Sequence, residues 1–178
     1  QSLRNAGVDT AVRDALEGRL MAIAATHNVL TDQNLSAASL RQIVDGSVIP
    51  YRSNPGQLSV AGPDLKVSPK TAVVMALAFH ELAINALKYG ALSAPTGHVD
   101  VTWTVGPEDR LHIEWRESGG PPVRPPERRG FGARIIEAAL PGELAGTVSV
   151  DYRAEGLRCA IDAPLSALDK ADAFMPLG

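Results

Sequence analysis

The sequence predicts an α+β protein in which helices precede a β-sheet with one packed face and one solvated face. Two patterns predict this. Apolar residues recur at helical spacing in the first third of the chain, and the later part alternates apolar and polar residues with the period of a half-buried strand. The 178 residues, 45 % of them hydrophobic and 21 % charged, are enough for one globular domain with a helical appendage.

The first third is expected to be helical. Gln1 to Ala6 is typical of a helix end, and a further helix is predicted from about Ser36 to Val44. Between them an apolar stripe follows one helix face: Val12, Leu16, Leu20, Ile23, His27 and Leu30. Since such a stripe needs a partner, residues 1–46 are expected to form part of an antiparallel bundle, and residues 47–178 a second unit.

Short apolar runs interrupted by Pro and Gly follow residue 46 and predict short strands at 48–50, 57–60 and 64–67. A helix of about twenty residues is predicted next. Its expected start is Ser68, a good N-cap followed by proline, and its expected end is Gly90.

Three groups of alternating residues predict the main sheet, at 99–105, at 111–115 and at 148–161. Trp103, Trp115 and Cys159 fall on the apolar side of the alternation, so we expect them to be structural core residues. A loop rich in Pro and Arg precedes a short helix that opens with Gly130-Phe131-Gly132.

Composition and charge exclude several classes of protein. A net charge of −3 argues against a general nucleic-acid binder, and a single cysteine permits neither an internal disulfide nor a cysteine-based zinc site. The longest strongly apolar stretch, Thr71 to Phe79, is about half the length of a membrane span. No secretory signal pattern is present. We therefore expect a cytoplasmic protein with no nucleic-acid partner and no membrane segment in this chain.

Polar residues interrupt the long apolar helix at positions that share one face: Glu81, Asn85 and Lys88. A carboxylate, an amide oxygen and an ammonium group suit a divalent cation and a polyphosphate. The alternative is an ordinary solvated helix edge, and spacing alone does not separate the two. A zinc-protease motif is excluded, because the second histidine it needs is replaced by Ile84.

Two glycine-containing turns are the other candidates. Gly130-Phe131-Gly132 lacks the third glycine of a dinucleotide fingerprint, so it indicates only a turn at a helix N-terminus, where phosphate is favoured. Glu117 leaves a strand just before Gly119 and Gly120, which suits a carboxylate beside a flat ligand. The alternative for Glu117 is an acidic residue in a surface turn.

These segments together resemble the HWE family of sensor histidine kinases, within the GHKL ATPase superfamily. The N box is matched by His80-Glu81-Leu82-Ala83, Asn85-Ala86 and Lys88-Tyr89-Gly90-Ala91-Leu92-Ser93. Trp115 and Glu117 resemble the family's Trp-x-Glu pair, 130–136 resembles its second glycine box, and 17–30 resembles the second helix of its dimerisation and phosphotransfer domain.

The resemblance implies a Bergerat-type ATP-binding α/β sandwich, a mixed sheet covered by helices, as the catalytic domain in 47–178. It implies that Asn85 ligates Mg²⁺, that Glu81 orients or deprotonates the attacking imidazole, and that Glu117 reads adenine. The implied catalytic pair is Glu81 and His80, and the implied ATP-binding set is Asn85, Lys88, Tyr89, Glu117, Gly119, Gly120, Arg128, Gly130, Phe131 and Gly132.

The implied activity is Mg²⁺-ATP-dependent phosphoryl transfer to a histidine and onward to a response-regulator aspartate. Histidine kinases carry the phosphate-accepting histidine in a motif called the H box. None of the four histidines of this chain lies in such a motif: His27, His80, His98 and His112. The acceptor is therefore expected upstream, and self-phosphorylation of this chain is not expected. Implied partners are a response regulator, the kinase's own sensor domain and H-box helix, and a second copy through 1–46. Alternatives are a vestigial docking module without ATP turnover and a GHKL Ser/Thr kinase of an anti-sigma pathway.

The sequence departs from the family pattern at the ATP lid and near the end of the chain. Nine residues separate Gly120 from Gly130, which predicts a short, stiff lid. Its arginines, Arg124, Arg128 or Arg129, are expected to close on the triphosphate. Many GHKL proteins place a threonine after a glycine to contact adenine, whereas Leu157 follows Gly156 here, so that contact is expected to be absent or supplied differently.

Overall fold

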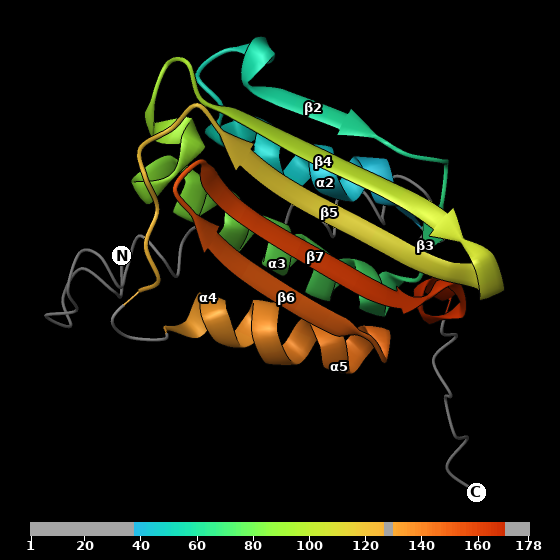
Figure 1. Ribbon diagram of the computed structural model, residues 1–178. Coiled ribbons are helices and arrows are strands. Elements are labelled where there is room, and N and C mark those ends of the chain that lie inside the picture. The colour runs from blue at the N-terminus through green and yellow to red at the C-terminus, as the bar shows by residue number, and fades with distance from the viewer. Residues whose placement is uncertain (1–37, 127–129, 170–178) are drawn as a thin grey trace, which may run out of the picture.

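The computed structural model describes residues 38–126 and 130–169, which form a sheet covered on one face by helices (Figure 1). β2 runs parallel to β4, and the other neighbours are antiparallel, so the sheet is mixed as expected. Its strands, in spatial order, are β2 (Leu58–Ala61), β4 (His98–Gly106), β5 (Arg110–Ser118), β7 (Gly156–Pro164) and β6 (Thr147–Arg153).

The helical layer lies behind the sheet in Figure 1, with α2 (Leu40–Val48) and α3 (Pro69–Tyr89) against its inner face. A continuous helical run lies alongside β6 at the edge of the sheet and precedes it in the chain. It consists of α4 (Phe131–Arg134), a π-helical turn (Ile135–Ala139) and α5 (Leu140–Leu144). A small two-stranded sheet pairs β1 (Ala38–Ser39) with β3 (Lys66–Val67). Short 3₁₀ turns cover Ile49–Tyr51, Pro55–Gln57, Ala91–Ser93, Pro107–Asp109 and Leu165–Asp169.

The long helix α3 has the predicted bounds. Ser68 caps its first turn by accepting a hydrogen bond from the Thr71 N–H at 3.5 Å, and the Gly90 N–H closes the last turn on the Ala86 carbonyl at 3.0 Å. By length and mean hydropathy, 1.3, α3 meets the criteria for a membrane span, but 61 % of the qualifying window is buried inside the fold. It is the central core helix, which explains its apolar surface.

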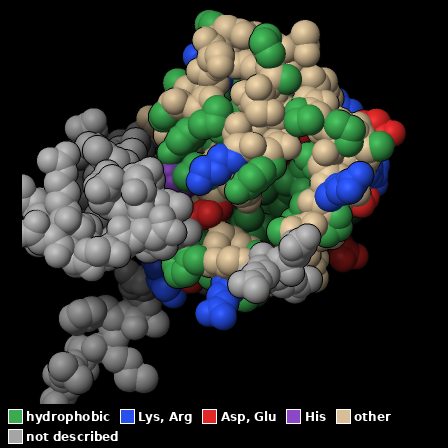
Figure 2. Space-filling view, turned by 90° about the vertical axis from the view of Figure 1, so that its left-hand side faces the viewer, with side chains coloured by type: hydrophobic (Ala, Val, Ile, Leu, Met, Phe, Trp, Pro, Cys, Tyr) green, Lys and Arg blue, Asp and Glu red, His purple; other side chains and the backbone are tan. Residues whose placement is uncertain are grey.

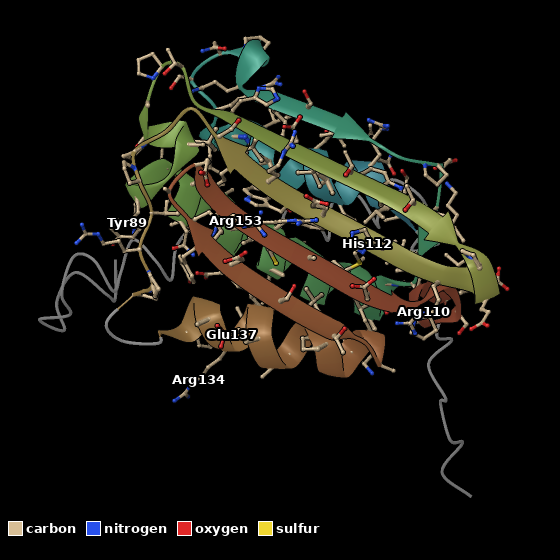
Figure 3. All side chains as sticks on the ribbon, in the orientation of Figure 1. Tyr89, Arg110, His112, Arg134, Glu137 and Arg153 are labelled. Carbon is tan, nitrogen blue, oxygen red and sulfur yellow. The ribbon has the colours of Figure 1, made fainter. Side chains whose placement is uncertain are left out.

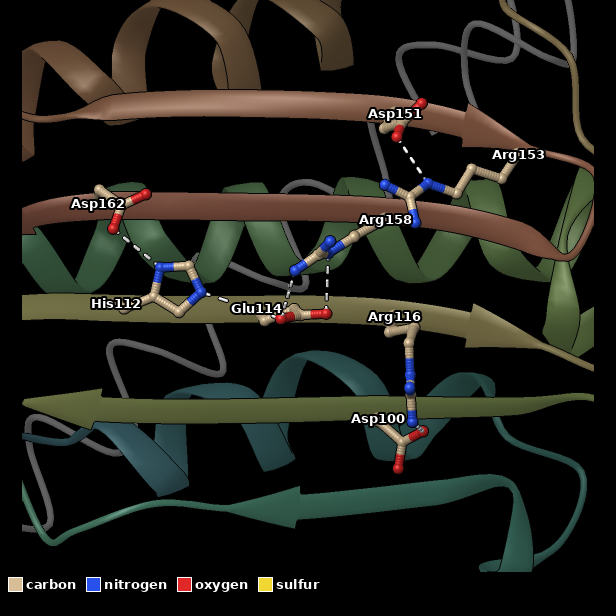
Figure 4. Close-up of polar contacts among 8 residues, drawn as sticks. All are labelled: Asp100, His112, Glu114, Arg116, Asp151, Arg153, Arg158 and Asp162. Atoms are coloured by element: carbon tan, nitrogen blue, oxygen red, sulfur yellow. Dashed lines mark hydrogen bonds and ion pairs between the residues drawn. The ribbon is translucent and has the colours of Figure 1, made fainter.

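The strands alternate as the sequence predicts. Their inner face is buried, including Trp103, Trp115 and Cys159, and burial raises the pKa of the Cys159 thiol to about 12. The outer face carries polar pairs between neighbouring strands (Figure 4): the ion pairs of Arg158 with Glu114 and Arg116 with Asp100, and a hydrogen bond between His112 and Asp162. Partly exposed pairs of this kind contribute little to stability, so burial on the inner face holds the two layers together.

The prediction of a strand at 48–50 is wrong. Val48 ends α2 and packs in the core, and Pro50 lies in a 3₁₀ turn, where its missing N–H is tolerated. α2 also starts and ends later than predicted, because Ser39 and Gln42 form its capping box and Gly46 does not stop it. α2 packs on α3 and spans the boundary placed between 46 and 47. The apolar stripe of the first third lies outside the described residues, so the division into two units stays a prediction.

Candidate functional site

A cleft lies at the C-terminal end of α3, bordered by the segment after β5, by α4 and by the β6–β7 hairpin. It consists of a larger cavity of about 450 Å³ and a smaller one of about 350 Å³. The two share five lining residues and are therefore continuous: Asn85, Tyr89, Pro126, Tyr152 and Leu157. Figure 2 shows the hollow on this end of the molecule, with largely hydrophobic walls and charged side chains near its rim.

The larger cavity has mainly apolar walls. Tyr152 and Leu157 are cross-strand partners in the β6–β7 hairpin, so both contribute to one wall. Pro122, Val123 and Pro126, from the segment after β5, also line it, and Arg124 and Glu117 supply charge. A cavity with this lining suits a flat, largely apolar ligand that carries at least one hydrogen-bond donor.

Glu117 is the buried acceptor of the larger cavity, with only 3 % of its surface exposed. The Ala91 N–H donates to its Oε2 at 2.9 Å and the Trp115 indole N–H donates to its Oε1 at 3.1 Å. Burial raises the pKa of Glu117, and these two hydrogen bonds counteract part of that increase. A Cβ at position 90 would overlap the Oε2 atom, so the carboxylate occupies space that only a glycine leaves open.

The smaller cavity brings oxygen ligands together with the glycine turn. Glu81, 6 % exposed, and Asn85 lie one turn apart on α3 and both line this cavity, as do Gly130 and Gly132. A Cβ at position 132 would overlap the Glu81 Oε2, so α4 approaches α3 closely because residue 132 is glycine. Figure 3 shows Tyr89 at this end of α3 and Glu137, another lining residue, on the helical run.

The oxygen ligands fit a cation that retains water. Within 38–126 and 130–169, no group of three or more His, Cys, Asp and Glu side chains could hold a metal ion. A Glu81 carboxylate and an Asn85 amide match the few protein ligands that Mg²⁺ takes when phosphate oxygens and waters complete its shell. The residues present therefore fit Mg²⁺ bound together with a polyphosphate.

Several predicted site residues lie outside the cleft. Lys88 is exposed on α3 and lines neither cavity. Gly119 has a φ of +69°, and a Cβ there would meet the Thr96 carbonyl oxygen at 2.5 Å, whereas one at Gly120 would meet the Ala91 Cα at 2.5 Å. These glycines let the turn after β5 pack on the segment after α3. Arg128 and Arg129 lie outside the described residues.

His80 does not line either cavity, whereas its predicted catalytic partner Glu81 does. The His80 ring is buried and its Nδ1 lies 2.9 Å from the Tyr51 hydroxyl oxygen, with the two rings edge to face. Burial raises the pKa of Tyr51, and the Glu81 charge raises it further. The structure therefore places His80 in contact with the turn after α2, next to the cleft but not in it.

Sequence reasoning missed Val150 and Tyr152 of the β6–β7 hairpin, and it considered Leu157 only as a residue that replaces a threonine. Tyr152 and Leu157 line both cavities, and Val150 lines the smaller one. Leu157 occupies the place where many GHKL proteins have a threonine, so the contact it offers a ligand is apolar. Strand alternation already put these side chains on the inner face, but it did not indicate that this end of the hairpin borders the cleft.

Comparison with known proteins finds similarity to histidine kinases. Residues 1–64 match the HWE histidine kinase family. The blue-light-activated histidine kinases of Brucella ovis and Brucella anthropi are both 36 % identical to the chain, over 170 and 171 residues, which is 93 % and 94 % of this chain. The chain spans about a third of the length of these curated relatives, 35 % in each case.

Solved structures show the same fold. The histidine kinase domain of a blue-light activated histidine kinase from Erythrobacter litoralis superposes with a TM-score of 0.70 at 18 % identity, covering 89 % of this chain and 83 % of that one. The mycobacterial sensor histidine kinase MprB gives a TM-score of 0.54 at 17 % identity, covering 72 % and 97 %. The mixed sheet and its helical cover are therefore those of histidine kinase catalytic domains.

Proposed function

Since the chain matches the HWE histidine kinase family over residues 1–64 and is 36 % identical to curated histidine kinases, we propose that it is a member of that family. We propose further that its cleft binds Mg²⁺-ATP for phosphoryl transfer to a histidine and onward to a response-regulator aspartate. The observation that carries this proposal is the pairing of the two cavities. An apolar cavity with a buried carboxylate, Glu117, opens into one that contains the Glu81 carboxylate, the Asn85 amide and the Gly130–Gly132 turn. That pairing matches a nucleotide, whose base is flat and whose phosphates are anionic.

The base is assigned to the larger cavity. Tyr152, Leu157 and Val123 offer apolar surface to its faces, and the ionised Glu117 accepts a hydrogen bond from the exocyclic amine of adenine. Leu157 takes part by packing alone, so the contact that a threonine makes in many relatives is replaced by an apolar one. Recognition of the base then depends chiefly on Glu117.

The phosphates are assigned to the smaller cavity. Gly130, Phe131 and Gly132 line this cavity at the start of the helical run. The first N–H groups of a helix have no partner within it, which favours anionic oxygens there. Asn85 supplies an amide oxygen to Mg²⁺, which neutralises the charge of the phosphates when bound. Two cationic groups lie near this end of α3 but outside the smaller cavity: Arg124 lines the larger cavity, and Lys88 lies on the exposed helix surface.

Glu81 is assigned the role of orienting, or accepting a proton from, the attacking imidazole. Its carboxylate is buried beside the space assigned to the phosphates, which places it within reach of a group that attacks there. The partners in this proposal are a response regulator, a sensor domain and H-box helix of the same kinase, and a second copy of the chain through 1–46. A cytoplasmic location belongs to the same proposal.

Thermal unfolding with a non-hydrolysable ATP analogue tests nucleotide binding. With the analogue near 100 times its Kd, linkage gives about 2.7 kcal/mol of stabilisation. For a domain of this size that corresponds to a rise in Tm of roughly 5–11 °C. We expect this rise with Mg²⁺ and a much smaller one with EDTA. No rise at millimolar analogue would instead support a vestigial docking module.

Incubation with radiolabelled ATP and candidate acceptor proteins tests the transfer step. A phosphohistidine is hydrolysed in acid and survives in base, whereas phosphoserine and phosphothreonine survive in acid. We expect acid-labile label on a histidine-containing acceptor domain and its passage to a response regulator. Acid-stable label on a protein acceptor would favour the Ser/Thr kinase.

Gly132→Ala is expected to weaken Mg²⁺-ATP binding about tenfold, or about 1.4 kcal/mol. The added Cβ overlaps the Glu81 Oε2, so either the carboxylate moves or α4 withdraws from α3. Isothermal titration calorimetry measures the loss. The matched control is Gly142→Ala on the same helical run, where a Cβ meets nothing within 4 Å, and equal affinities of the two variants would contradict the assignment.

The free energy of unfolding and the nucleotide affinity should change in opposite directions as the pH rises. Because burial raises the pKa of Glu117 above its ordinary value of 4.5, the folded state binds this proton more tightly than the unfolded chain. The free energy of unfolding therefore falls as the pH rises from the ordinary to the raised pKa. Nucleotide affinity rises across the same window, since only the ionised carboxylate is purely an acceptor.

Urea unfolding and calorimetric titration across this window measure the two trends. The other titratable groups that line the larger cavity are Tyr89, Arg124 and Tyr152, whose side-chain classes ordinarily ionise far above it. The Glu117→Gln variant should lose both trends. Retention of either trend in that variant would assign it to another group.

A further inference from the structure

The two tryptophans of the chain are equally buried but use their indole N–H groups differently. Trp103, 2 % exposed, donates from Nε1 to the Pro63 carbonyl oxygen at 2.8 Å. Trp115, 1 % exposed, donates from Nε1 to the Glu117 carboxylate at 3.1 Å. Trp115 and Glu117 are two residues apart on β5 and lie on the same face of the sheet. One indole thus supports a loop, and the other contacts a cleft residue.

Glu117 is held at both of its oxygens. The Ala91 N–H fixes Oε2 from the 3₁₀ turn after α3, and the Trp115 indole fixes Oε1 from within β5. A carboxylate has about four acceptor positions, and these two donors use two of them. Because Glu117 lines the larger cavity, lone pairs that the protein leaves unused are available to a ligand there. The donors come from different elements, so together they fix the rotation of the carboxylate as well as its position.

We propose that Trp115 is a positioning residue for base recognition, which holds the Glu117 carboxylate in the orientation that meets the exocyclic amine of the nucleotide. This inference rests on the proposed function, and it assigns Trp115 a role beyond the structural one expected from strand alternation. Trp115 does not line either cavity and touches no ligand itself. Without its N–H, Oε1 loses a fixed partner, and a ligand must restrain a freer carboxylate.

Trp115→Phe tests the proposal, with Trp103→Phe as the matched control. Both changes keep a buried aromatic ring and remove one indole N–H, but only the first touches Glu117. We would titrate each variant with Mg²⁺-ADP and with Mg²⁺-tripolyphosphate, which lacks the base. Trp115→Phe should weaken Mg²⁺-ADP binding roughly 10- to 150-fold, the range for a lost hydrogen bond to a charged group. It should leave tripolyphosphate binding unchanged, and Trp103→Phe should leave both unchanged.

The pH profile gives a second readout that a purely structural role would not move. The Trp115 hydrogen bond lowers the pKa of Glu117. Without it, the loss of Mg²⁺-ADP affinity that accompanies protonation of Glu117 should occur at a higher pH. The Trp103→Phe control should keep the wild-type profile. If Trp115→Phe folds poorly, the Trp103→Phe chain can be made with the benzothiophene analogue of tryptophan. In that chain only the remaining tryptophan loses its N–H.

The outcomes separate this inference from the proposed function. If the wild type binds Mg²⁺-ADP, and removal of the Trp115 N–H changes neither affinity nor pH profile relative to the control, the positioning role is overturned while the nucleotide site stands. Equal loss of Mg²⁺-ADP and tripolyphosphate binding would also overturn it, because that result indicates general disruption of the cleft. If the wild type binds no nucleotide, both are overturned.

Discussion

Asn85→Ala is expected to weaken Mg²⁺-ATP binding by at least about tenfold, because loss even of an outer-shell partner of a metal costs roughly 10- to 100-fold in affinity. Asn85 lines both cavities, so its side-chain amide oxygen lies where the two meet. ATP in EDTA should bind the variant and the wild type almost equally, since Asn85 contributes through the metal. Calorimetric titration with and without Mg²⁺ measures the difference.

The control is Lys70→Ala, an exposed change at the opposite end of α3, which should leave both affinities unchanged. If Asn85→Ala weakens the binding of Mg²⁺-ATP and of metal-free ATP equally, Asn85 is not a metal ligand and only lines the cleft. Such a result would leave the Glu81 and Glu137 carboxylates as the candidate metal ligands in the lining of the smaller cavity.

Glu117→Gln is expected to lower both stability and nucleotide affinity. Each carboxylate oxygen accepts from a protein N–H, so the amide nitrogen of glutamine must face one of two donors, Ala91 N–H or Trp115 Nε1–H. A buried donor left without its acceptor costs about 1–3 kcal/mol. For this chain length that is a fall in Tm of roughly 2–12 °C. Removal of the buried charge offsets part of the loss.

The affinity loss should be specific to ligands that contain the base. Mg²⁺-ADP binding should weaken, whereas tripolyphosphate binding should stay near the wild-type value. Glu114→Gln is the matched control, because Glu114 lies on the same strand but faces outward, where it pairs with Arg158 (Figure 4). If Glu117→Gln binds Mg²⁺-ADP as the wild type does, the base is not read by this carboxylate.

The parts of the fold that were predictable are those governed by local sequence. α3 was found with its observed bounds because an N-cap, a proline and a glycine stop all mark its ends. The strands β4 to β7 follow from strict alternation over a sheet with one solvated face. The strand expected at 48–50 failed because a short apolar run fits a helix end as well as a strand, and packing on α3 decides between them.

The candidate site was predictable where one element carries it. Glu81 and Asn85 share a face of α3, so their approach follows from helical spacing. Contributions that depend on tertiary structure were missed, as with Val150 and Tyr152 in the hairpin wall. His80 is adjacent to Glu81 in sequence, but a rotation of about 100° per residue turns it toward Tyr51 and away from the cleft.

The buried thiol of Cys159 has a practical consequence for studying the cleft. Maleimides and iodoacetamides react with thiolates, and a cysteine whose pKa is about 12 forms almost none at neutral pH. Since Cys159 is the only native cysteine, a cysteine introduced at Leu87, which is 39 % exposed on α3 and outside both cavity linings, would be the sole reactive position. A fluorophore attached there would report nucleotide binding in the otherwise native chain.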